Sequence, residues 1–343
     1  MLTRDELKKI DQSGMCSIYD KWPNLADKAF SNSIEKIQFE DSNHIVFAGM
    51  GGSGTIGDVF SAILSKTDIH VEVVKGYHLP KTVKSDSLLV CTSVSGNTVE
   101  TNSILKEGIS RGCKIISFSS NGKMEEKCLS EKIEYRKIPM QHSPRTSFVE
   151  YLYTMINVLS PIIPISDSQI KESIIELKKI KQNISSENIS NNNSSYELAK
   201  WITKIPIIYY PWGLHSVAIR FKNSLQENTK MPAMVEDVIE ASHNSIVSWE
   251  GNHQVQPILI QGKDDYVKTK ERWIALKEYF NENEIDYNEI YSSTGNILAK
   301  IVGLIYKLDY TSIYKALLSN IDPTPVNSIS ILKKKIQEKN NTR

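Results

Sequence analysis

The chain has 343 residues, of which 40% are hydrophobic and 24% charged, and its formal net charge at pH 7 is +1. This length suits one large domain or two medium ones, and the apolar fraction is ample for a buried core. A net charge this small provides no overall field to attract nucleic acid or an anionic membrane. An anionic ligand would therefore have to be bound by a local site.

The start of the chain and its cysteines indicate the compartment. The opening residues, MLTRDELKK, are charged rather than apolar, and no run of eighteen apolar residues occurs. Neither a secretory signal nor a membrane-spanning helix is predicted. Cys16, Cys91, Cys113 and Cys128 include no closely spaced pair, so neither a zinc site nor a disulfide framework is indicated. We expect a cytoplasmic protein with buried free thiols.

The first half of the chain alternates short apolar runs with amphipathic stretches, which is typical of a parallel sheet with flanking helices. Residues 5–37 are expected to form two helices, and a further helix is expected to end near Ser65. The expected strands are His44–Ala48, Val71–Val74, Leu88–Cys91, Lys114–Ser119 and Glu134–Ile138.

A glycine-rich turn follows the first expected strand. Gly49, Gly51 and Gly54 have the G-x-G-x-x-G spacing of a dinucleotide fingerprint. That fingerprint expects an acidic residue at the end of the next strand, but here this strand ends at Lys75. We interpret the glycines as allowing the backbone to approach a smaller ligand closely, with the dinucleotide site as the alternative.

A hydroxyl-rich turn follows the apolar run Leu88–Cys91. It contains Ser93, Ser95, Gly96, Asn97 and Thr98. At the start of a helix, such residues place hydroxyls and free backbone N–H groups around one point, with the positive end of the helix dipole behind them. A phosphate is the natural occupant. The same residue types also form ordinary helix caps, so the turn alone leaves that alternative open.

Pro144 and Arg145 stand just before an apolar helix expected over Phe148–Leu159. A cation at a helix start opposes the helix dipole, so Arg145 is expected to meet a ligand unless it is simply solvated. Residues 166–182 are expected to form a charged helix. The Asn/Ser-rich stretch over residues 185–195 is expected to be a low-complexity linker.

The second half repeats this order of elements without a detectable sequence repeat. The expected strands are Ile205–Tyr210, Ile258–Ile260 and Tyr287–Ile290, and the expected helices are Ser216–Gln226, residues 269–282, Ile297–Leu308 and a terminal helix that carries a lysine run. We therefore predict an α/β protein with two domains, each a mostly parallel sheet flanked by helices. The expected limits are residues 1–160 and 197–343, with 161–196 as a helical and low-complexity linker.

Six blocks of sequence occur in a specific order. They are Gly51-Gly52-Ser53-Gly54, Ser93-x-Ser95-Gly96-Asn97-Thr98-x-Glu100-Thr101, Pro144-Arg145, Glu227-Asn228-Thr229-Lys230-x-Pro232-Ala233, Ser242-His243-Asn244 and Asp322-Pro323-Thr324-Pro325-Val326-x-x-Ile329-x-x-Leu332-Lys333. Together they resemble the bifunctional phosphoglucose/phosphomannose isomerase family over nearly the whole chain. The resemblance implies two sugar-isomerase (SIS) domains and a homodimer with shared active sites.

The resemblance also implies roles for individual residues. Glu227 matches the catalytic glutamate, His243 the ring-opening histidine, which enters from the neighbouring subunit, and Arg145 and Lys333 the other charged active-site groups. The residues implied in substrate binding are Gly52, Ser53, Ser93, Ser95, Thr98, Arg145 and Thr324. The sequence departs from the family at Thr229, where alanine is usual, and at Glu240-Ala241-Ser242, where Glu-Leu-Asn is usual.

The implied reaction interconverts glucose 6-phosphate and mannose 6-phosphate with fructose 6-phosphate. It requires ring opening and then proton transfer between C2 and C1 through an enediolate, which one base on one face of the sugar can perform. The expected partners are these sugar phosphates, with no metal, cofactor, nucleic acid or membrane. The alternatives are another SIS-domain sugar-phosphate isomerase and a non-catalytic sugar-phosphate sensor, which would not need the acid/base pair Glu227 and His243.

Overall fold

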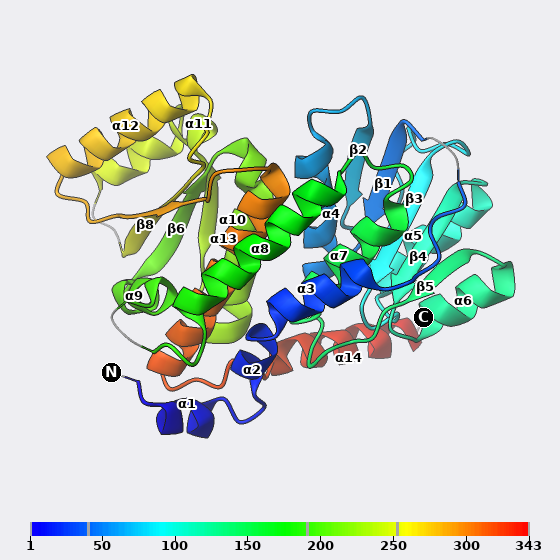
Figure 1. Ribbon diagram of the computed structural model, residues 1–343, viewed down its shortest axis with the longest axis horizontal. Coiled ribbons are helices and arrows are strands. Elements are labelled where there is room, and N and C mark those ends of the chain that lie inside the picture. The colour runs from blue at the N-terminus through cyan, green and yellow to red at the C-terminus, as the bar shows by residue number, and fades with distance from the viewer. Residues whose placement is uncertain (1, 40–41, 190–191, 252–253, 342–343) are drawn as a thin grey trace.

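The computed structural model describes residues 2–39, 42–189, 192–251 and 254–341, except for the side chains of residues 337 and 339–341. Two sheets lie in separate halves of the molecule, and helices cover them (Figure 1). The strand order is β2-β1-β3-β4-β5 in the first sheet and β7-β6-β8-β9 in the second, and all of these neighbours pair in parallel. The predicted α/β class is confirmed.

The strands agree closely with those expected from the sequence. They are β1 (His44–Ala48), β2 (His70–Val74), β3 (Leu88–Ser93), β4 (Lys114–Ser119), β5 (Glu134–Lys137), β6 (Ile205–Tyr210), β7 (Met234–Asp237), β8 (Val255–Gln261) and β9 (Asn288–Tyr291). Strand β7 was not expected. It is a half-exposed edge strand with the sequence MVED, so it lacks the apolar run that marks a buried strand.

The helices cover the sheets and join the two halves. They are α1 (Arg4–Ile10), α2 (Met15–Tyr19), α3 (Trp22–Ser31), α4 (Gly52–Leu64), α5 (Val99–Ser110), α6 (Lys123–Glu131), α7 (Phe148–Leu159), α8 (Asp167–Ile184), α9 (Ser194–Trp201), α10 (His215–Ser224), α11 (Val238–Ala241), α12 (Val267–Glu282), α13 (Ile297–Leu318) and α14 (Asn327–Asn341), with short helical turns η1 (Trp212–Leu214), η2 (Leu225–Thr229) and η3 (Ser245–Glu250).

Two helical expectations were wrong in detail. The N-terminal segment forms three helices rather than two, because Gly14 adopts a left-handed conformation, with φ of 72°, between α1 and α2. Helix α13 continues past the expected end at Leu308 to Leu318, and Asp309, the charged residue at which the apolar pattern breaks, is fully buried inside it.

The segment expected to be a linker packs into the core. Helix α8 contacts α13 and α3, and it crosses between the two halves in Figure 1. Asn193 caps α9, is fully buried, and donates from Nδ2 to the Ile184 carbonyl at 3.2 Å. Residues 190–191 lie outside the described residues. A single hydrophobic cluster includes residues of both halves, and the expected domain limits stay a prediction.

The strand order positions the site. In the first sheet β1 lies between β2 and β3, and in the second sheet β6 lies between β7 and β8. The strand order therefore reverses between β1 and β3 and again between β6 and β8. Ligands of open α/β sheets bind outside the carboxyl ends of the strands at such a reversal. In the first sheet, this point is flanked by the glycine-rich turn after β1 and the hydroxyl-rich turn after β3.

Candidate active site

Two of the hydroxyls in the hydroxyl-rich turn after β3 lie together. The Oγ of Ser93 lies 2.9 Å from Oγ1 of Thr98. Thr98 occupies the N-cap position of α5, yet its side chain makes no capping hydrogen bond to that helix. The alternative of an ordinary capped helix is therefore not the arrangement found, and the first N–H groups of α5 have no cap from the Thr98 hydroxyl.

The backbone of this turn requires glycine. Gly96 has φ of 66°, and a Cβ at this position would lie 1.6 Å from the Asn121 carbonyl oxygen. Asn97 also secures the turn, since its Oδ1 accepts from the Lys123 backbone N–H at 3.1 Å. The turn is thus fixed by contacts with the loop after β4 and by a residue without a side chain.

The glycine-rich turn after β1 packs tightly against its surroundings. A Cβ on Gly49 would lie 3.0 Å from the Thr92 carbonyl oxygen, and one on Gly54 would lie 2.7 Å from the Gly49 carbonyl oxygen. Helix packing thus accounts for two of the three fingerprint glycines. Helix α4 also begins without a side-chain cap, and Ser53 lies in its first turn. Two helix starts with hydroxyls beside them therefore meet at the strand reversal.

Glu227 lies in the π-helical turn η2, which continues α10. The Thr229 hydroxyl donates to the Leu225 carbonyl at 2.6 Å, the acceptor that the Thr229 N–H would use in an α-helix. Such wider turns are often found at functional sites. The Glu227 carboxylate is 29% exposed and lines a cleft of about 680 Å³ that also includes Gly51, Lys230 and Val326.

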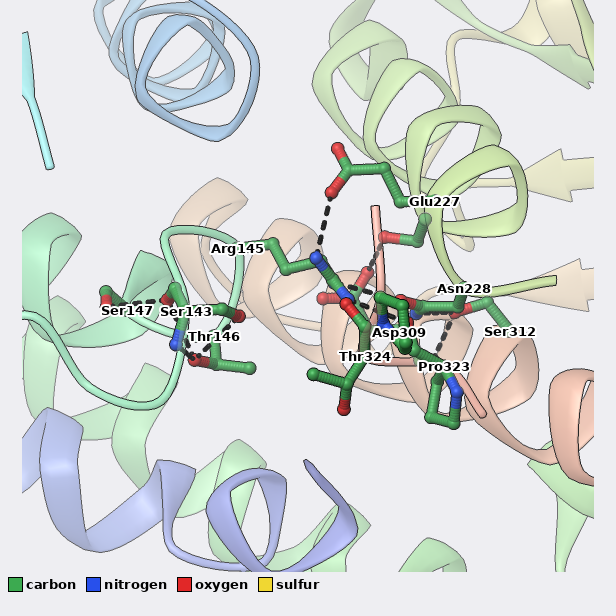
Figure 2. A network of polar contacts seen from close by, with 12 residues as sticks. Ser143, Arg145, Thr146, Ser147, Glu227, Asn228, Asp309, Ser312, Pro323 and Thr324 are labelled. Carbon is green, nitrogen blue, oxygen red and sulfur yellow. Dashed lines mark hydrogen bonds and ion pairs between the residues drawn. The ribbon is translucent and has the colours of Figure 1, made fainter. Parts of the chain in front are cut away.

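Arg145 holds this carboxylate (Figure 2). Its Nη1 donates to Glu227 Oε2 at 3.3 Å, and its Nε donates to Asn228 Oδ1 at 3.0 Å. Its Nη2 donates to the carbonyls of Pro323 at 2.7 Å and Thr324 at 2.9 Å. Arg145 is only 7% exposed, so it is not a solvated surface arginine. Its guanidinium therefore links the segment of Arg145 to two others far away in the sequence, residues 227–228 and 323–324.

A second buried arginine supports the first. Arg220 donates from Nη2 to the Arg145 carbonyl at 2.8 Å, and from Nε and Nη2 to Asp309 Oδ2 at 3.0 and 2.6 Å. Its guanidinium carbon lies 4.1 Å from the ring centre of Phe148. Burial acts to lower the pKa of Arg220, but Asp309, Tyr19 and Glu227 together outweigh it and the pKa is raised. The cation is therefore firmly held beneath the site.

Lys230 is a site residue to which the sequence reasoning gave no role, although it falls in the same block as Glu227. It adopts a left-handed conformation, with φ of 61°, and its Nζ donates to the carbonyls of Glu227 at 2.5 Å and Pro325 at 2.7 Å. Burial and then the nearby Arg145 guanidinium lower the pKa of its ammonium group. Asn228, Arg220 and Asp309 were likewise not assigned. The only sequence signal for Arg220 and Asp309 was that each is a charged residue among apolar residues of a helix.

Two predicted residues stand apart from the Glu227 carboxylate, and a third meets Arg145 only through its backbone. Within the described part of the chain, His243 is exposed after α11 and Lys333 is exposed on α14, and neither lines the cleft. Thr324 contributes its carbonyl to Arg145, while its hydroxyl is buried without a hydrogen-bond partner among the described residues. Gly52 is close to both arginines, since a Cβ there would lie 3.6 Å from Arg220 Nη1 and 3.9 Å from the Arg145 Cα.

Two family models match the chain. Residues 38–130 match the SIS domain, and residues 191–336 match the bacterial phospho-glucose isomerase C-terminal SIS domain. The fold also matches solved structures at low identity. A hypothetical protein from Thermus thermophilus superimposes with a TM-score of 0.74 at 11% identity, covering 98% of this chain and 94% of that one. The predicted SIS-type fold is confirmed.

Curated relatives match over most of the chain. A bifunctional phosphoglucose/phosphomannose isomerase from Caldicellulosiruptor bescii is 32% identical over 338 residues, covering 94% of this chain and 98% of that protein. The Aquifex aeolicus enzyme of the same name is 31% identical over 300 residues, covering 86% and 90%. A D-glucosamine-6-phosphate 4-epimerase from Sulfolobus acidocaldarius is 30% identical over 252 residues, covering 72% and 77%. As the six sequence blocks predict, this chain belongs to the bifunctional phosphoglucose/phosphomannose isomerase family.

Proposed function

We propose that the chain is an isomerase that interconverts glucose 6-phosphate and mannose 6-phosphate with fructose 6-phosphate. The observation that carries the proposal is the carboxylate of Glu227, which faces the cleft and is held 3.3 Å from Arg145 Nη1. A positioned base of this kind is what a proton transfer between adjacent carbons requires. The family membership supports the choice of substrates.

The substrate phosphate is assigned to the point where α4 and α5 begin. The hydroxyls of Ser53, Ser93, Ser95 and Thr98, together with the uncapped N–H groups of these helices, offer hydrogen bonds and a positive dipole end to an anion. With the phosphate there, the reacting carbons would extend toward the cleft. Binding of the phosphate would therefore position the sugar, and the base would not have to bind it.

Glu227 is proposed to move the proton between C2 and C1. Glucose and mannose 6-phosphate differ only in configuration at C2, and this carbon is planar in the enediolate. One intermediate is therefore common to both aldoses. Arg145 orients the carboxylate, and its positive charge, with that of Lys230 beside the cleft, stabilises charge that develops on the enediolate oxygens. Lys333 is exposed on α14 and does not line the cleft, so its role as a further cation rests on the family resemblance alone.

Ring opening is assigned to His243, because imidazole exchanges protons near neutral pH. The side chain is exposed and lies away from the cleft of its own chain, so the proposal places it in the active site of a partner in a homodimer. A two-fold symmetric dimer would contain two identical composite sites. A cytoplasmic location is part of the same proposal, and the four free cysteines support it.

The test is Glu227→Gln, with Glu240→Gln as the matched control. Both changes remove one carboxylate and keep the side-chain shape, but only Glu227 lines the cleft. Glu227→Gln should lower kcat by about 10²–10⁴, the usual contribution of a general base, and stop solvent-deuterium exchange at C2. Glu240→Gln should retain both the wild-type kcat and the exchange at C2. Normal exchange in the Glu227 variant would transfer the role of base to another residue.

The substrate panel separates this activity from its alternatives. Wild-type protein should convert both aldose phosphates to fructose 6-phosphate, and chelator treatment should leave turnover intact. One relative is named D-glucosamine-6-phosphate 4-epimerase, so glucosamine 6-phosphate belongs in the panel. Turnover of that substrate alone would favour an epimerase, and binding of phosphosugars without turnover would favour a sensor.

Mixing inactive homodimers tests the placement of His243. Glu227→Gln and His243→Ala dimers, allowed to exchange subunits, should form heterodimers with one intact site each. Half of the dimers are mixed at full random exchange, so about a quarter of wild-type activity should return. If exchange is demonstrated and no activity returns, His243 does not act across the interface.

A further inference from the structure

Three side chains with metal-binding atoms meet at the far end of the first sheet. His44 begins β1, and its partner in the parallel register is His70, which begins β2. Glu72 follows two residues later on β2, and because side chains alternate between faces, it shares the face of His70. Their ligand atoms all lie within 4.8 Å of one another. This cluster is separate from the site described above, which lies at the carboxyl ends of the same strands.

The ring of His44 presents a free nitrogen to this cluster. Its Nε2 is buried, has no hydrogen-bond partner among the described residues, and lies 3.8 Å from Glu72 Oε2. A buried polar atom without a partner costs free energy, so its presence here calls for a ligand. The nitrogen points at a carboxylate but is too far from it for a hydrogen bond.

The other ring nitrogen of His44 is already engaged. Nδ1 lies 3.0 Å from Ser87 Oγ, and the same hydroxyl accepts from the Lys84 backbone N–H at 3.0 Å. If Nδ1 carries the proton and donates it to Ser87, the lone pair of Nε2 is free and aimed at the cluster. Metal-binding histidines usually have such an outer hydrogen bond, which fixes the tautomer and the ring orientation.

We propose that His44, His70 and Glu72 bind a divalent transition-metal ion of the zinc class. Two imidazoles and one carboxylate suit zinc, whereas magnesium and calcium prefer all-oxygen sites. Bond lengths of about 2.0–2.2 Å place tetrahedral ligand atoms roughly 3.3 Å apart. Rotation of His70 and Glu72, which are not buried, closes the remaining distance. Water completes the coordination.

The bound ion would join the edge strand to the sheet. Strand β2 pairs only with β1 among the described strands, so one ladder of hydrogen bonds holds it to the sheet. An ion bound to His44 on one strand and to two side chains on the other adds a link at the first residue pair. The cluster and the glycine-rich turn lie at opposite ends of β1, four residue steps or roughly 13 Å apart. Isomerase turnover should therefore not depend on this ion.

The test is titration of chelator-treated full-length protein with zinc sulfate in a calorimeter. Wild-type protein should bind one zinc ion per chain at this site, and zinc should raise its melting temperature and slow amide hydrogen exchange in β2. His70→Ala and Glu72→Gln should each weaken zinc binding by more than about 100-fold, because they remove direct ligands rather than outer-shell groups. Aldose-phosphate turnover, measured alongside, reports that each variant is folded.

His78→Ala provides the matched control. His78 is also on the surface of the first half and lies near a carboxylate, with Nδ1 3.8 Å from Glu107 Oε2. Its replacement should leave zinc affinity unchanged. Equal zinc affinity in wild-type, His70→Ala and Glu72→Gln proteins would assign the binding to other surface groups and overturn the proposal. So would a wild-type titration without saturable binding.

Discussion

The buried ion pair between Arg220 and Asp309 gives a stability prediction of large size. Asp309 is fully buried, and its carboxylate accepts two hydrogen bonds from Arg220, one from Ser224 Oγ at 2.7 Å and one from the Tyr19 hydroxyl at 2.9 Å. Asp309→Asn keeps the shape and leaves Arg220 as a buried cation without a counter-charge. Breaking such a pair costs about 3–5 kcal/mol, a large part of a typical unfolding free energy of about 5–15 kcal/mol.

Urea unfolding of three variants tests this magnitude. Asp27→Asn is the matched control, because Asp27 pairs with Lys178 at 2.7 Å while both side chains are about half exposed. Its loss should cost less than about 1 kcal/mol. Adding Arg220→Met to Asp309→Asn should recover part of the loss, since the unpaired cation is then gone. If Asp309→Asn lowers the unfolding free energy no more than Asp27→Asn, the buried pair does not stabilise the protein as argued.

Three further predictions concern the hydroxyl-rich turn, the turn that contains Glu227, and the start of α10 at His215. Ser95→Ala and Thr98→Ala should mainly raise KM, each costing about 1.5–3 kcal/mol of phosphate binding, whereas Ser110→Ala at the other end of α5 should not; unchanged KM in both would remove the turn from the site. Thr229→Ala should lower the unfolding free energy by about 1 kcal/mol, because the Leu225 carbonyl and the Met231 N–H both lose their hydrogen bond to the hydroxyl. Urea unfolding measures this, and an unchanged unfolding free energy would contradict the prediction. Burial lowers the pKa of His215, so the folded state binds fewer protons than the unfolded state. The unfolding free energy should therefore fall as pH drops below about 6.5. His215→Gln should lose less unfolding free energy between pH 7.5 and 5, and an identical loss would assign the effect to other groups.

The parallel sheets were predictable because their central strands are buried on both faces. Strands β4 and β6 have the bounds that their apolar runs indicated, and the turn residues after β1 and β3 pointed to the ligand end of the first sheet. The edge strand β7 was not predictable in this way, because Met234–Asp237 contains two acidic residues and is only half buried. Local pattern therefore identified the central strands and three of the four edge strands, and missed the edge strand β7, which has no apolar run.

The network beneath the site could not be read from local sequence. Asp309 looks like the end of a helix when its neighbours alone are considered, and only residues far away in the chain, Arg220, Ser224 and Tyr19, make its burial favourable. Similarly, the sequence predicts a helix through Gln226, whereas the turn widens at Leu225–Thr229 and the wider turn contains Glu227. The family resemblance identified the base, and the geometry identified Arg145 as the group that holds it.

The long sequence separation of these contacts has a consequence for synthesis of the chain. Tyr19 bonds to Asp309, 290 residues later, and Trp22 stacks on Tyr306 of the same helix. At roughly 5–20 residues per second, a ribosome needs about 15–60 s to make that interval. Throughout this time the aromatic side chains of the N-terminal helices lack the part of their covering surface that α13 provides. We expect such a nascent chain to expose apolar segments to chaperones, and its active site is complete only after residue 324 has been made.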